Sequence, residues 1–553
     1  MRVVPMVFTS VLLLILPWPL LSVGLVAGID ANHHARLMRR LTTGASGFAL
    51  ACAVLASVTY ALGMTRSVLW PALRLPAGLG SLGISVNVNV LTVLMALLVA
   101  FVGVIVARYS SAHMDGDAHE GRFHRWLSLT LGSFFMLILA DDLWGFFIFW
   151  VATSLSLHEL LAFYRDRPGA VLAARKKYLL HRIADASLFA AFVLIVRALH
   201  TSQFTGIASA LAAVHGPLPE TLQVASGLIV VSAVLKSAQF PSHGWLIQVM
   251  EAPTPVSALM HAGIIYTGAF LLLRVATLVT RVNWASDTLV LVGLFSLAAT
   301  SLMMMTATNI KGSLAYSTSA QMGFMLMECG LGLYSLAALH MVSHAVYKAH
   351  AFLSSGSVVD HFRAPALSAE LRSASGWSVM WSFAIATPIV IGIEAVFGTP
   401  SPQQPALIIM GIILMVALSQ LLLQALNMSE SGRGVMLLVM VVLSTLVSAT
   451  YFGLDKCMSA LLGADLPAAK GFAGAVQDWF LGLIVAVFVG LLLVQQMLPR
   501  IMHKPFWQTG YVHLYNGLYI DMVFTRLVRS FGRIGAVGPL RTAGEGQSRE
   551  VVS

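Results

Sequence analysis

Long apolar stretches separated by short polar segments dominate this sequence. A helix needs about 20 apolar residues to cross the hydrocarbon core of a bilayer, which is about 30 Å thick, and about fifteen stretches meet this requirement with few charges. The predicted spans are 5–27, 42–64, 88–107, 126–143, 144–164, 178–198, 222–241, 256–279, 288–307, 313–333, 334–356, 377–397, 405–427, 434–453 and 474–498. The first follows a single basic residue, Arg2, and is too long for the apolar core of a signal peptide, so we expect it to remain a span. The pattern predicts an all-α polytopic membrane protein.

The composition excludes the other broad classes of protein. Of the 553 residues, 58% are hydrophobic and only 10% are charged, whereas a soluble domain usually has about 25% charged residues. A disordered chain would need low hydrophobicity and high charge. The three cysteines, Cys52, Cys329 and Cys457, are too few and too scattered for a disulfide framework or a paired-thiol metal site. We therefore expect neither a metal nor a cofactor in this chain.

The basic residues predict the orientation. The net charge is +10, and in membrane proteins Lys and Arg concentrate in cytoplasmic loops. With the N-terminus outside and the C-terminus in the cytoplasm, the inner loops hold most of the 33 Lys and Arg residues. The densest basic segment, 165–177, is then interpreted as a positive-inside anchor that needs no nucleic-acid partner. We expect lipid around the predicted spans.

The C-terminal tail has a different pattern. Residues 511–521 are rich in tyrosine, and the next segment mixes apolar residues with Arg526, Arg529 and Arg533. This alternation predicts an amphipathic helix at the membrane interface. Its aromatic side chains would lie at headgroup level or dock on a partner. We expect the residues after about 540 to form a frayed end.

Lys236 is the most informative ionisable residue inside a span. Such groups cost about 2.5–3.5 kcal/mol at a helix centre, so each is a functional hypothesis. Lys236 lies about fifteen residues into its predicted helix, where its side chain could hardly reach either face of the membrane. Pro241 should break that helix nearby. Free carbonyl groups beside a buried amine are typical of an ion or proton station in a discontinuous helix. The alternative is a structural pair with a neighbouring carboxylate.

A second polar row lies on a later span. His340, His344 and Lys348 are spaced i, i+4 and i+8, so they share one face of a helix. Two histidines at i and i+4 can also bind zinc, but no Cys, Asp or Glu close in sequence supplies a further ligand. Groups that titrate near neutral pH favour a proton relay.

Carboxylates complete the set of candidates. Asp185 lies near the start of a helix, where it could instead form an intrahelical pair with Arg182 or His181. Glu159 lies near a helix end and faces either the protein interior or the cytoplasmic boundary. The other polar residues near a break or within a span are His243, Glu251, His261, Glu328 and Glu394.

Four segments carry a resemblance to a known family. Residues 236–246 (KSAQFPSHGWL), 252–262 (APTPVSALMHA), 311–323 (KGSLAYSTSAQMG) and 340–349 (HMVSHAVYKA) resemble the proton-conducting antiporter-like subunits of respiratory complex I, of the subunit L type, and of multisubunit Na⁺/H⁺ antiporters. The resemblance covers roughly 90–360. It implies two inverted five-helix repeats, each with a broken helix, that form proton half-channels.

The resemblance also implies domains and residue roles. The domains are N-terminal helices in 1–110, a first repeat in 111–280, a second repeat in 281–430, C-terminal helices in 431–500 and an amphipathic cytoplasmic tail in 501–553. Lys236 would be the lysine of the broken helix, and Lys348 with His340 and His344 would form the central relay. Asp185 and Arg182 would belong to the sixth helix, and Lys311 would be the polar lysine of the next repeat.

The sequence also departs from that pattern. The family has Trp-Glu on its fifth helix, whereas this chain has Trp150 followed by Val151, so we expect Glu159 to replace the missing carboxylate. Asn309 stands where the family has Asp. The second broken helix, expected near 387–394, offers only Glu394 in place of a lysine.

Three further segments, 154–164, 241–253 and 511–521, resemble the DabB-type membrane subunits of DabA–DabB inorganic-carbon accumulation systems. In that family the partner DabA is a soluble, membrane-attached subunit with a zinc site like that of β-carbonic anhydrase. The resemblance implies a non-enzymatic subunit that uses a proton or sodium gradient to drive one-way CO₂ hydration on a DabA-like zinc subunit.

Residues 505–530 and 242–251 are the docking candidates, and His243, Glu251 and His261 are the candidates for coupling to the partner. The alternatives are a subunit of a complex I-like proton pump or of a multisubunit Na⁺/H⁺ antiporter. A structural scaffold is disfavoured by the cost of burying Lys236 and Lys348.

Overall fold

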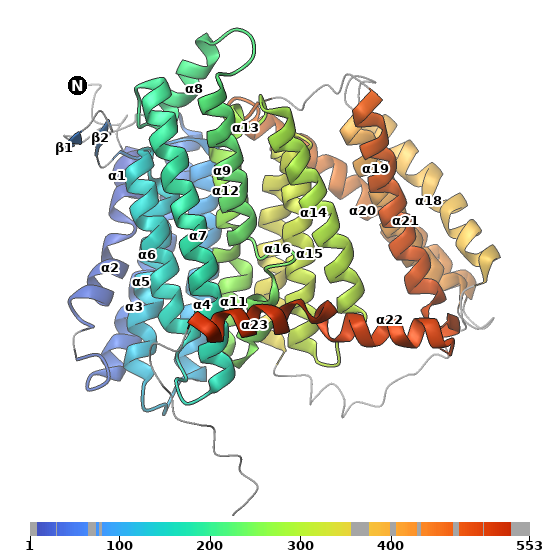
Figure 1. The fold of residues 1–553 in the computed structure, drawn as a ribbon, viewed down its shortest axis with the longest axis horizontal. Coiled ribbons are helices and arrows are strands. Elements are labelled where there is room, and N and C mark those ends of the chain that lie inside the picture. The colour runs from blue at the N-terminus through green and yellow to red at the C-terminus, as the bar shows by residue number, and fades with distance from the viewer. Residues whose placement is uncertain are drawn as a thin grey trace, which may run out of the picture.

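The computed structural model is a bundle of long helices, in which those within residues 8–354 lie nearly parallel and those within residues 376–501 are tilted against them (Figure 1). It describes residues 8–28, 30–64, 73–76, 80–83, 85–355, 375–398, 405–427, 433–467, 475–501 and 503–531. Arg533 and the frayed end predicted after about 540 lie outside these ranges.

The N-terminal part of the bundle consists of six helices and a small hairpin. The helices are α1 (Phe8–Ile15), α2 (Trp18–Leu25), α3 (Ala35–Ala61), α4 (Val90–His113), α5 (Glu120–Leu139) and α6 (Leu143–Leu161), and the hairpin pairs β1 (Leu73–Arg74) with β2 (Ser81–Leu82). The helices α1 and α2 together form one candidate span, which agrees with the predicted first span.

The middle part contains the interrupted helices. It runs through α7 (Pro168–Leu199), α8 (Phe204–Ala213), α9 (Glu220–Lys236), α10 (Gly244–Gln248), η3 (Val249–Glu251), α11 (Thr254–Ala262), η4 (Ile264–Tyr266), α12 (Thr267–Arg274) and α13 (Ala276–Val279). The predicted break after Lys236 is present, because α9 ends at that residue and α10 begins at Gly244. A second interruption separates α11 from α12.

The C-terminal part continues with α14 (Asn283–Met304), α15 (Ile310–Gly330), α16 (Tyr334–Ser354), α18 (Gly376–Phe397), α19 (Pro405–Leu426), α20 (Arg433–Leu462) and α21 (Ala475–Ile501). The helices α18, α19 and α20 share a small apolar core of their own around Ala386, Val390, Leu418 and Leu422. The interruption expected near 387–394 is not found, because α18 is one helix that contains Pro388.

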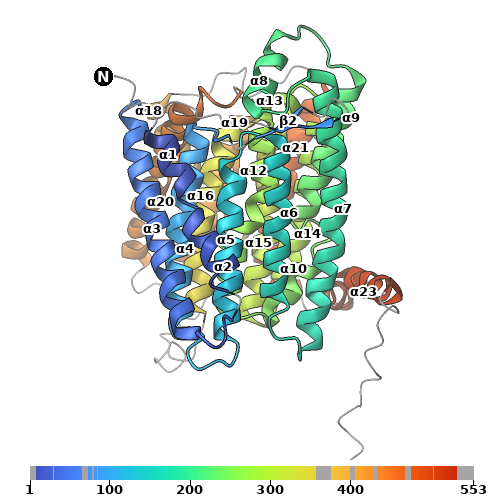
Figure 2. The same cartoon turned by 90° about the vertical axis from the view of Figure 1, so that its left-hand side faces the viewer.

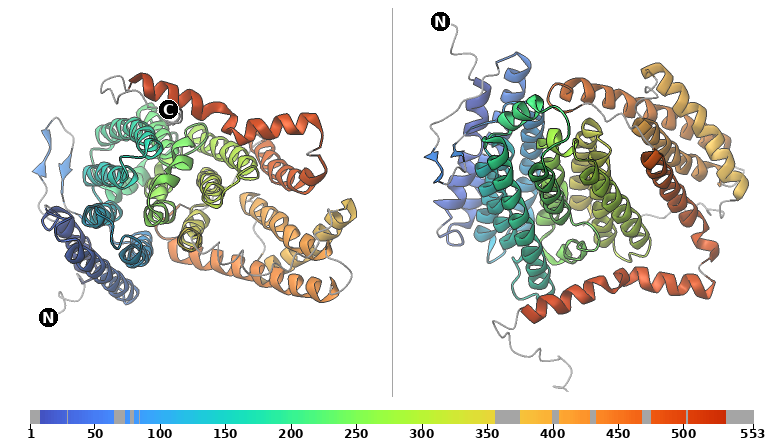
Figure 3. Two further views of the ribbon diagram at one scale, coloured as in Figure 1. Left: turned by 90° about the horizontal axis from the view of Figure 1, so that it is seen from below. Right: turned by 45° about the horizontal axis from the view of Figure 1, so that its top comes forward.

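The tail forms α22 (Pro505–Tyr515), η5 (Gly517–Tyr519) and α23 (Ile520–Phe531). These elements run along one end of the bundle, from α21 toward α7, and lie at its flank when the bundle is seen from below (Figures 1 and 3). We call this the lower end, because it is at the bottom of Figure 1. The helix α1 begins near the opposite, upper end (Figure 2).

Eleven described helices are long and apolar enough to cross a membrane. The prediction of about fifteen spans is therefore not confirmed as a number. The four other predicted spans coincide with α5, α9, α15 and α16, and α9 has only 17 residues. Lys236, Lys311 and the row from His340 to Lys348 lie on three of these four helices. Several of the predicted polar residues thus lie on the helices that are least able to face lipid alone.

The most extensive contact between two described helices joins α14 to α15. A Cβ at Gly293 would lie 2.4 Å from the carbonyl oxygen of Gly323, and a Cβ at Gly323 would lie 2.6 Å from that of Gly293. Small residues of this kind let two membrane helices approach with their backbones in contact. This contact positions α15, which carries several groups of the site described below.

Replacement of Gly293 by alanine should force α14 and α15 apart. We expect Gly293→Ala to lower the free energy of unfolding by about 1–3 kcal/mol, the usual cost of overpacking, and to lower the unfolding temperature in detergent. The matched control is Gly490→Ala on α21, where a Cβ would meet nothing within 4 Å. Equal unfolding temperatures for the two variants would contradict this account of the contact.

Candidate ion-translocation site

Lys236 is the last residue of α9, at the point where the helix breaks. Its side chain is buried. Backbone groups freed by the break bond to side chains of neighbouring helices: Ser319 Oγ donates to the Ala238 carbonyl oxygen over 2.8 Å, and the Phe240 amide donates to Ser296 Oγ over 3.1 Å. Inside a membrane, irregular backbone is stable only where protein groups satisfy it in this way.

The carboxylate partner of Lys236 is Asp185, on α7. Lys236 Nζ lies 3.2 Å from Asp185 Oδ1, and Trp150 Nε1 donates to the same oxygen over 2.8 Å. Arg182 Nη2 lies 2.6 Å from Asp185 Oδ2. The ammonium group also lies over the Trp150 ring, 4.5 Å from its centroid. The intrahelical pair between Arg182 and Asp185 and the pair with Lys236 are therefore both present.

Glu159 does not replace the missing carboxylate, so this expectation is corrected. Its Oε2 lies 2.9 Å from Arg165 Nη2, and the two side chains are 29% and 64% exposed. Glu159 therefore lies at the surface end of α6. Asp185 can reach the lysine because α7 packs closely against α9.

The basic segment 165–177 is more than a surface anchor, because Lys176 and Lys177 are fully buried. Lys177 Nζ donates to the carbonyl oxygen of Ser154 over 2.6 Å and to its Oγ over 3.3 Å. Ser154 Oγ lies 3.0 Å from His181 Nδ1. Lys177, His181 and Asp185 thus form a polar row on α7 that ends at Lys236.

Sequence reasoning missed Lys177 and His181 as parts of the site. Their spacing to Asp185 is i, i+4 and i+8, the same spacing that identified the row on α16. That signal was present in the sequence, but the abundance of basic residues nearby favoured a surface interpretation.

The second row lies on α16, as predicted. Lys348 Nζ donates to the Leu314 carbonyl oxygen over 3.0 Å, and His344 Nδ1 lies 2.7 Å from the hydroxyl group of Tyr266. His340 continues the row, with its ring centroid 6.1 Å from that of His344. We call His340, His344 and Lys348 the central row. Tyr266 belongs with it and was not foreseen.

His340 connects the central row to α15. Its Nδ1 lies 3.0 Å from Glu328 Oε2, and its Nε2 lies 2.8 Å from Gln321 Oε1. Glu328 showed no partner in the sequence, since the two residues lie on different helices. The row therefore ends at a buried carboxylate.

His261 lies beside the central row and is not on an exposed surface. It is buried, its Nδ1 lies 3.0 Å from Thr318 Oγ1, and its ring stacks on Phe352 with centroids 4.2 Å apart. The Tyr266 hydroxyl group donates to the His261 carbonyl oxygen over 3.1 Å. The interruption between α11 and α12 thus places a histidine and a tyrosine beside α16.

The remaining candidates lie apart from these rows. Lys311 Nζ donates to Thr254 Oγ1 over 3.1 Å at the start of α15. His243 is buried between the break and α10, whereas Glu251 is half exposed and lies 3.9 Å from Arg167. Glu394 lies on α18, which packs with α19 and α20.

The helix α15 lies between the two rows. Ser319 contacts the break after Lys236, Thr318 contacts His261, and Gln321 contacts His340. The arrangement brings amines, imidazoles and carboxylates together inside a membrane protein, where such groups mark ion pathways and proton relays. In the described part of the chain, no three His, Cys, Asp or Glu side chains gather in a way that could hold a metal ion.

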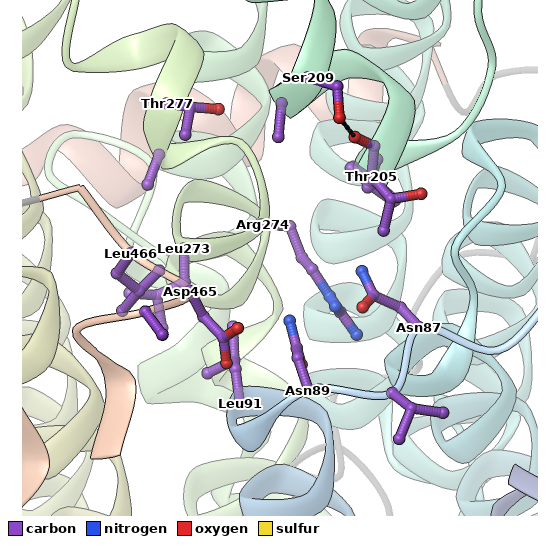
Figure 4. A pocket seen from close by; sticks show the side chains of 15 residues that line it. Asn87, Asn89, Leu91, Thr205, Ser209, Leu273, Arg274, Thr277, Asp465 and Leu466 are labelled. Carbon is purple, nitrogen blue, oxygen red and sulfur yellow. Dashed lines mark hydrogen bonds between the residues drawn. The ribbon is translucent and has the colours of Figure 1, made fainter. Parts of the chain in front are cut away.

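A polar pocket of about 380 Å³ lies at the upper end. Figure 4 shows Arg274 extending into the space between Asp465 and Asn87. Arg274 Nη2 donates to Thr92 Oγ1 over 2.7 Å, and Asp465 Oδ2 accepts a bond of 3.0 Å from the amide of Val90. Burial raises the pKa of Asp465, although the Val90 amide and Arg274 act in the opposite direction. No residue predicted from the sequence lines this pocket.

Comparison with known families identifies the fold. Residues 140–401 match the membrane region of the NADH:quinone oxidoreductase/Mrp antiporter family, and residues 75–124 match the N-terminus of chain 5 of NADH-ubiquinone oxidoreductase (complex I). Among solved structures, the Mrp complex from Dietzia sp. DQ12-45-1b aligns with a TM-score of 0.62 at 20% identity. The alignment covers 97% of this chain and 60% of that chain, and it shows the shared fold.

Two curated relatives align along most of their length. A probable inorganic carbon transporter subunit DabB2 of Halothiobacillus neapolitanus is 40% identical, over 95% of this chain and 94% of the relative. A probable inorganic carbon transporter subunit DabB of Hydrogenovibrio crunogenus is 36% identical, over 80% of this chain and 82% of the relative. This chain is therefore a multi-pass membrane protein that belongs to the DabB family of inorganic carbon transporter subunits.

Proposed function

We propose that this chain is the ion-translocating membrane subunit of an energy-coupled uptake complex for inorganic carbon. A proton or sodium gradient drives CO₂ hydration in one direction on a DabA-like subunit that holds the zinc, and this chain itself catalyses no reaction. It lies in a bacterial inner membrane with its N-terminus outside and its C-terminus in the cytoplasm. The observation that carries the proposal is the cluster of buried Lys236, Asp185 and Trp150, with the partly exposed Arg182, at a helix break.

The proposed path crosses the bundle from the upper end to the lower end. The polar pocket beside Arg274 gives access from outside. Tyr266, the residue directly before α12, contacts His344 of the central row. Polar groups of α15 link this row to the break, and Lys236 passes the proton through Asp185 to the α7 row.

The cluster at Lys236 converts proton movement into a change of charge. With Lys236 protonated, the cluster contains two cations, Lys236 and Arg182, and one anion, Asp185. Loss of one proton makes it neutral. In a medium of low dielectric constant this change acts on neighbouring elements more strongly than it would in water. The short helix α10, which follows the break, is the nearest element along the chain.

The second candidate function is that of a Na⁺/H⁺ antiporter subunit or of a complex I-like proton pump. It is favoured by the match of residues 140–401 to the wider antiporter family and by the fold shared with the Mrp complex. Both functions use the same ion path, so they differ in the partner that the path serves.

Growth in air of a host without carbonic anhydrase separates these functions. We expect rescue only when this chain is expressed together with the large subunit encoded beside it, and loss of rescue on addition of an uncoupler. Expression of each chain alone is the control. Sodium-dependent proton flux in vesicles without any rescue of growth would favour the antiporter.

Two acidic residues on neighbouring helices test the assignment of the carboxylate. We expect Asp185→Asn to reduce growth to the level of the empty vector, because it removes the only carboxylate at Lys236 among the described ion pairs. Glu159→Gln should leave growth unchanged, since Glu159 pairs with Arg165 at the surface. The amount of each variant in the membrane is measured in parallel. The opposite pattern would restore Glu159 as the functional carboxylate.

Both lysines of the proposed path should be essential. Lys236→Ala and Lys348→Ala remove the amines at the break and in the central row, and we expect each to abolish carbon uptake while the protein still inserts into the membrane. Lys504→Ala is the matched control, because Lys504 is exposed. Growth in air of the Lys236→Ala strain at the wild-type rate would refute the proposed path.

A further inference from the structure

The tail runs along the lower end of the bundle and contacts the bundle at two separate places. We call residues 505–531 the C-terminal strap. At one end, α22 packs against α14 and α21 around an apolar cavity of about 410 Å³, whose lining includes Leu302, Leu498 and Trp507. At the other end, α23 contacts α7. The strap therefore connects helices that are far apart in the bundle (Figure 1).

One carboxylate of the strap, that of Asp521, bonds to α7 and α10. Lys176 Nζ donates to Asp521 Oδ1 over 2.7 Å and to Gln248 Oε1 over 2.9 Å, and Gln248 Nε2 donates to Asp521 Oδ2 over 2.5 Å. The Lys176 side chain is fully buried. No acidic residue lies within one turn of Lys176 on α7. A buried ammonium group needs a counter-charge, and the strap supplies it.

Asp521 also rests directly on α10. A Cβ at Gly244, the first residue of α10, would lie 2.2 Å from Asp521 Oδ1. Gln248, the last residue of α10, bonds to the other oxygen. One side chain of the strap thus contacts both ends of this five-residue helix, and only glycine at position 244 leaves room for it.

The same short helix contacts the polar row on α7. The ring of Trp245 lies edge-on to that of His181, with centroids 5.4 Å apart. Lys236 lies eight positions before Gly244 along the chain. The helix α10 is therefore held by Asp521, packs against His181, and is joined through the break to Lys236.

We propose that Asp521 is a positioning residue, through which the C-terminal strap clamps α10 and so sets the geometry of the relay at His181 and Lys236. The inference rests on the proposed function in one respect, namely that this relay carries the ion. The clamp acts on ion movement and leaves carbon binding, which we place on the partner, unchanged.

Two chemically different substitutions disturb the same contact. Asp521→Asn removes the negative charge and keeps the shape of the side chain. Gly244→Ala removes no polar group but places a methyl group where Asp521 Oδ1 lies. Gly510→Ala is the matched control, since it lies on α22, where a Cβ would meet nothing within 4 Å.

The experiment measures local opening and transport on the complete complex. We expect both variants to raise amide hydrogen exchange in residues 244–251 and to lower the maximal uptake per complex by about tenfold, within the usual range of coupling between sites. The CO₂ concentration for half-maximal uptake should stay at the wild-type value. Gly510→Ala should behave as the wild type in all three measurements.

Any other outcome contradicts the proposal that Asp521 positions α10. Unchanged exchange or unchanged uptake shows that the contact does not set the relay, and so does a response to only one of the two variants. Loss of both variants from the membrane makes the strap a folding anchor only. If the wild-type complex takes up no carbon, the proposed function fails, and the clamp is then judged by hydrogen exchange and by proton flux in vesicles.

Discussion

A buried ammonium group inside a membrane helix is the constraint on which this structure depends. Lys236 is held by Asp185 and Trp150, which lie on two other helices, so α6, α7 and α9 must pack in one register. Removing one partner of such a buried pair costs about 3–5 kcal/mol. The break after Lys236 is stable for a related reason, because Ser296 and Ser319 bond to the backbone groups that it frees. The site and the local fold therefore stabilise each other.

The helix α15 shows how one element can serve several neighbours. Successive residues of a helix point about 100° apart, so Thr318, Ser319 and Gln321 face different directions. They contact His261, the break and His340 respectively. Close contact with α14 through Gly293 and Gly323 holds this helix in place. These three polar residues, which would weaken a helix facing lipid, are thus directed at protein.

The sequence predicted the helices well and the contacts between them poorly. Apolar length determines where helices form, so each predicted span coincides with a helix, and spacing correctly identified the row on α16. Contacts across helices depend on packing, which a single sequence does not show. For this reason the sequence favours Glu159, which is close in sequence to the expected carboxylate, although Asp185 lies at Lys236. The sequence likewise does not show the partner of Glu328, because His340 lies on a different helix.

In the relay that we propose, the asymmetry between the two halves of the chain bears on why rows of groups are needed and not one lysine. In the C-terminal part, α18 is one continuous helix that shares a small apolar core with α19 and α20. Among the described residues, Lys236 is therefore the one lysine that stands directly before a break in a membrane helix. A unit charge acting over about 10 Å at an effective dielectric constant of about 20 is worth about 1.7 kcal/mol. Reversing a two-state element from 1:99 to 99:1 needs about 5.5 kcal/mol. One proton can bias such an element but cannot switch it, whereas several groups that change charge together along the central row and α7 can.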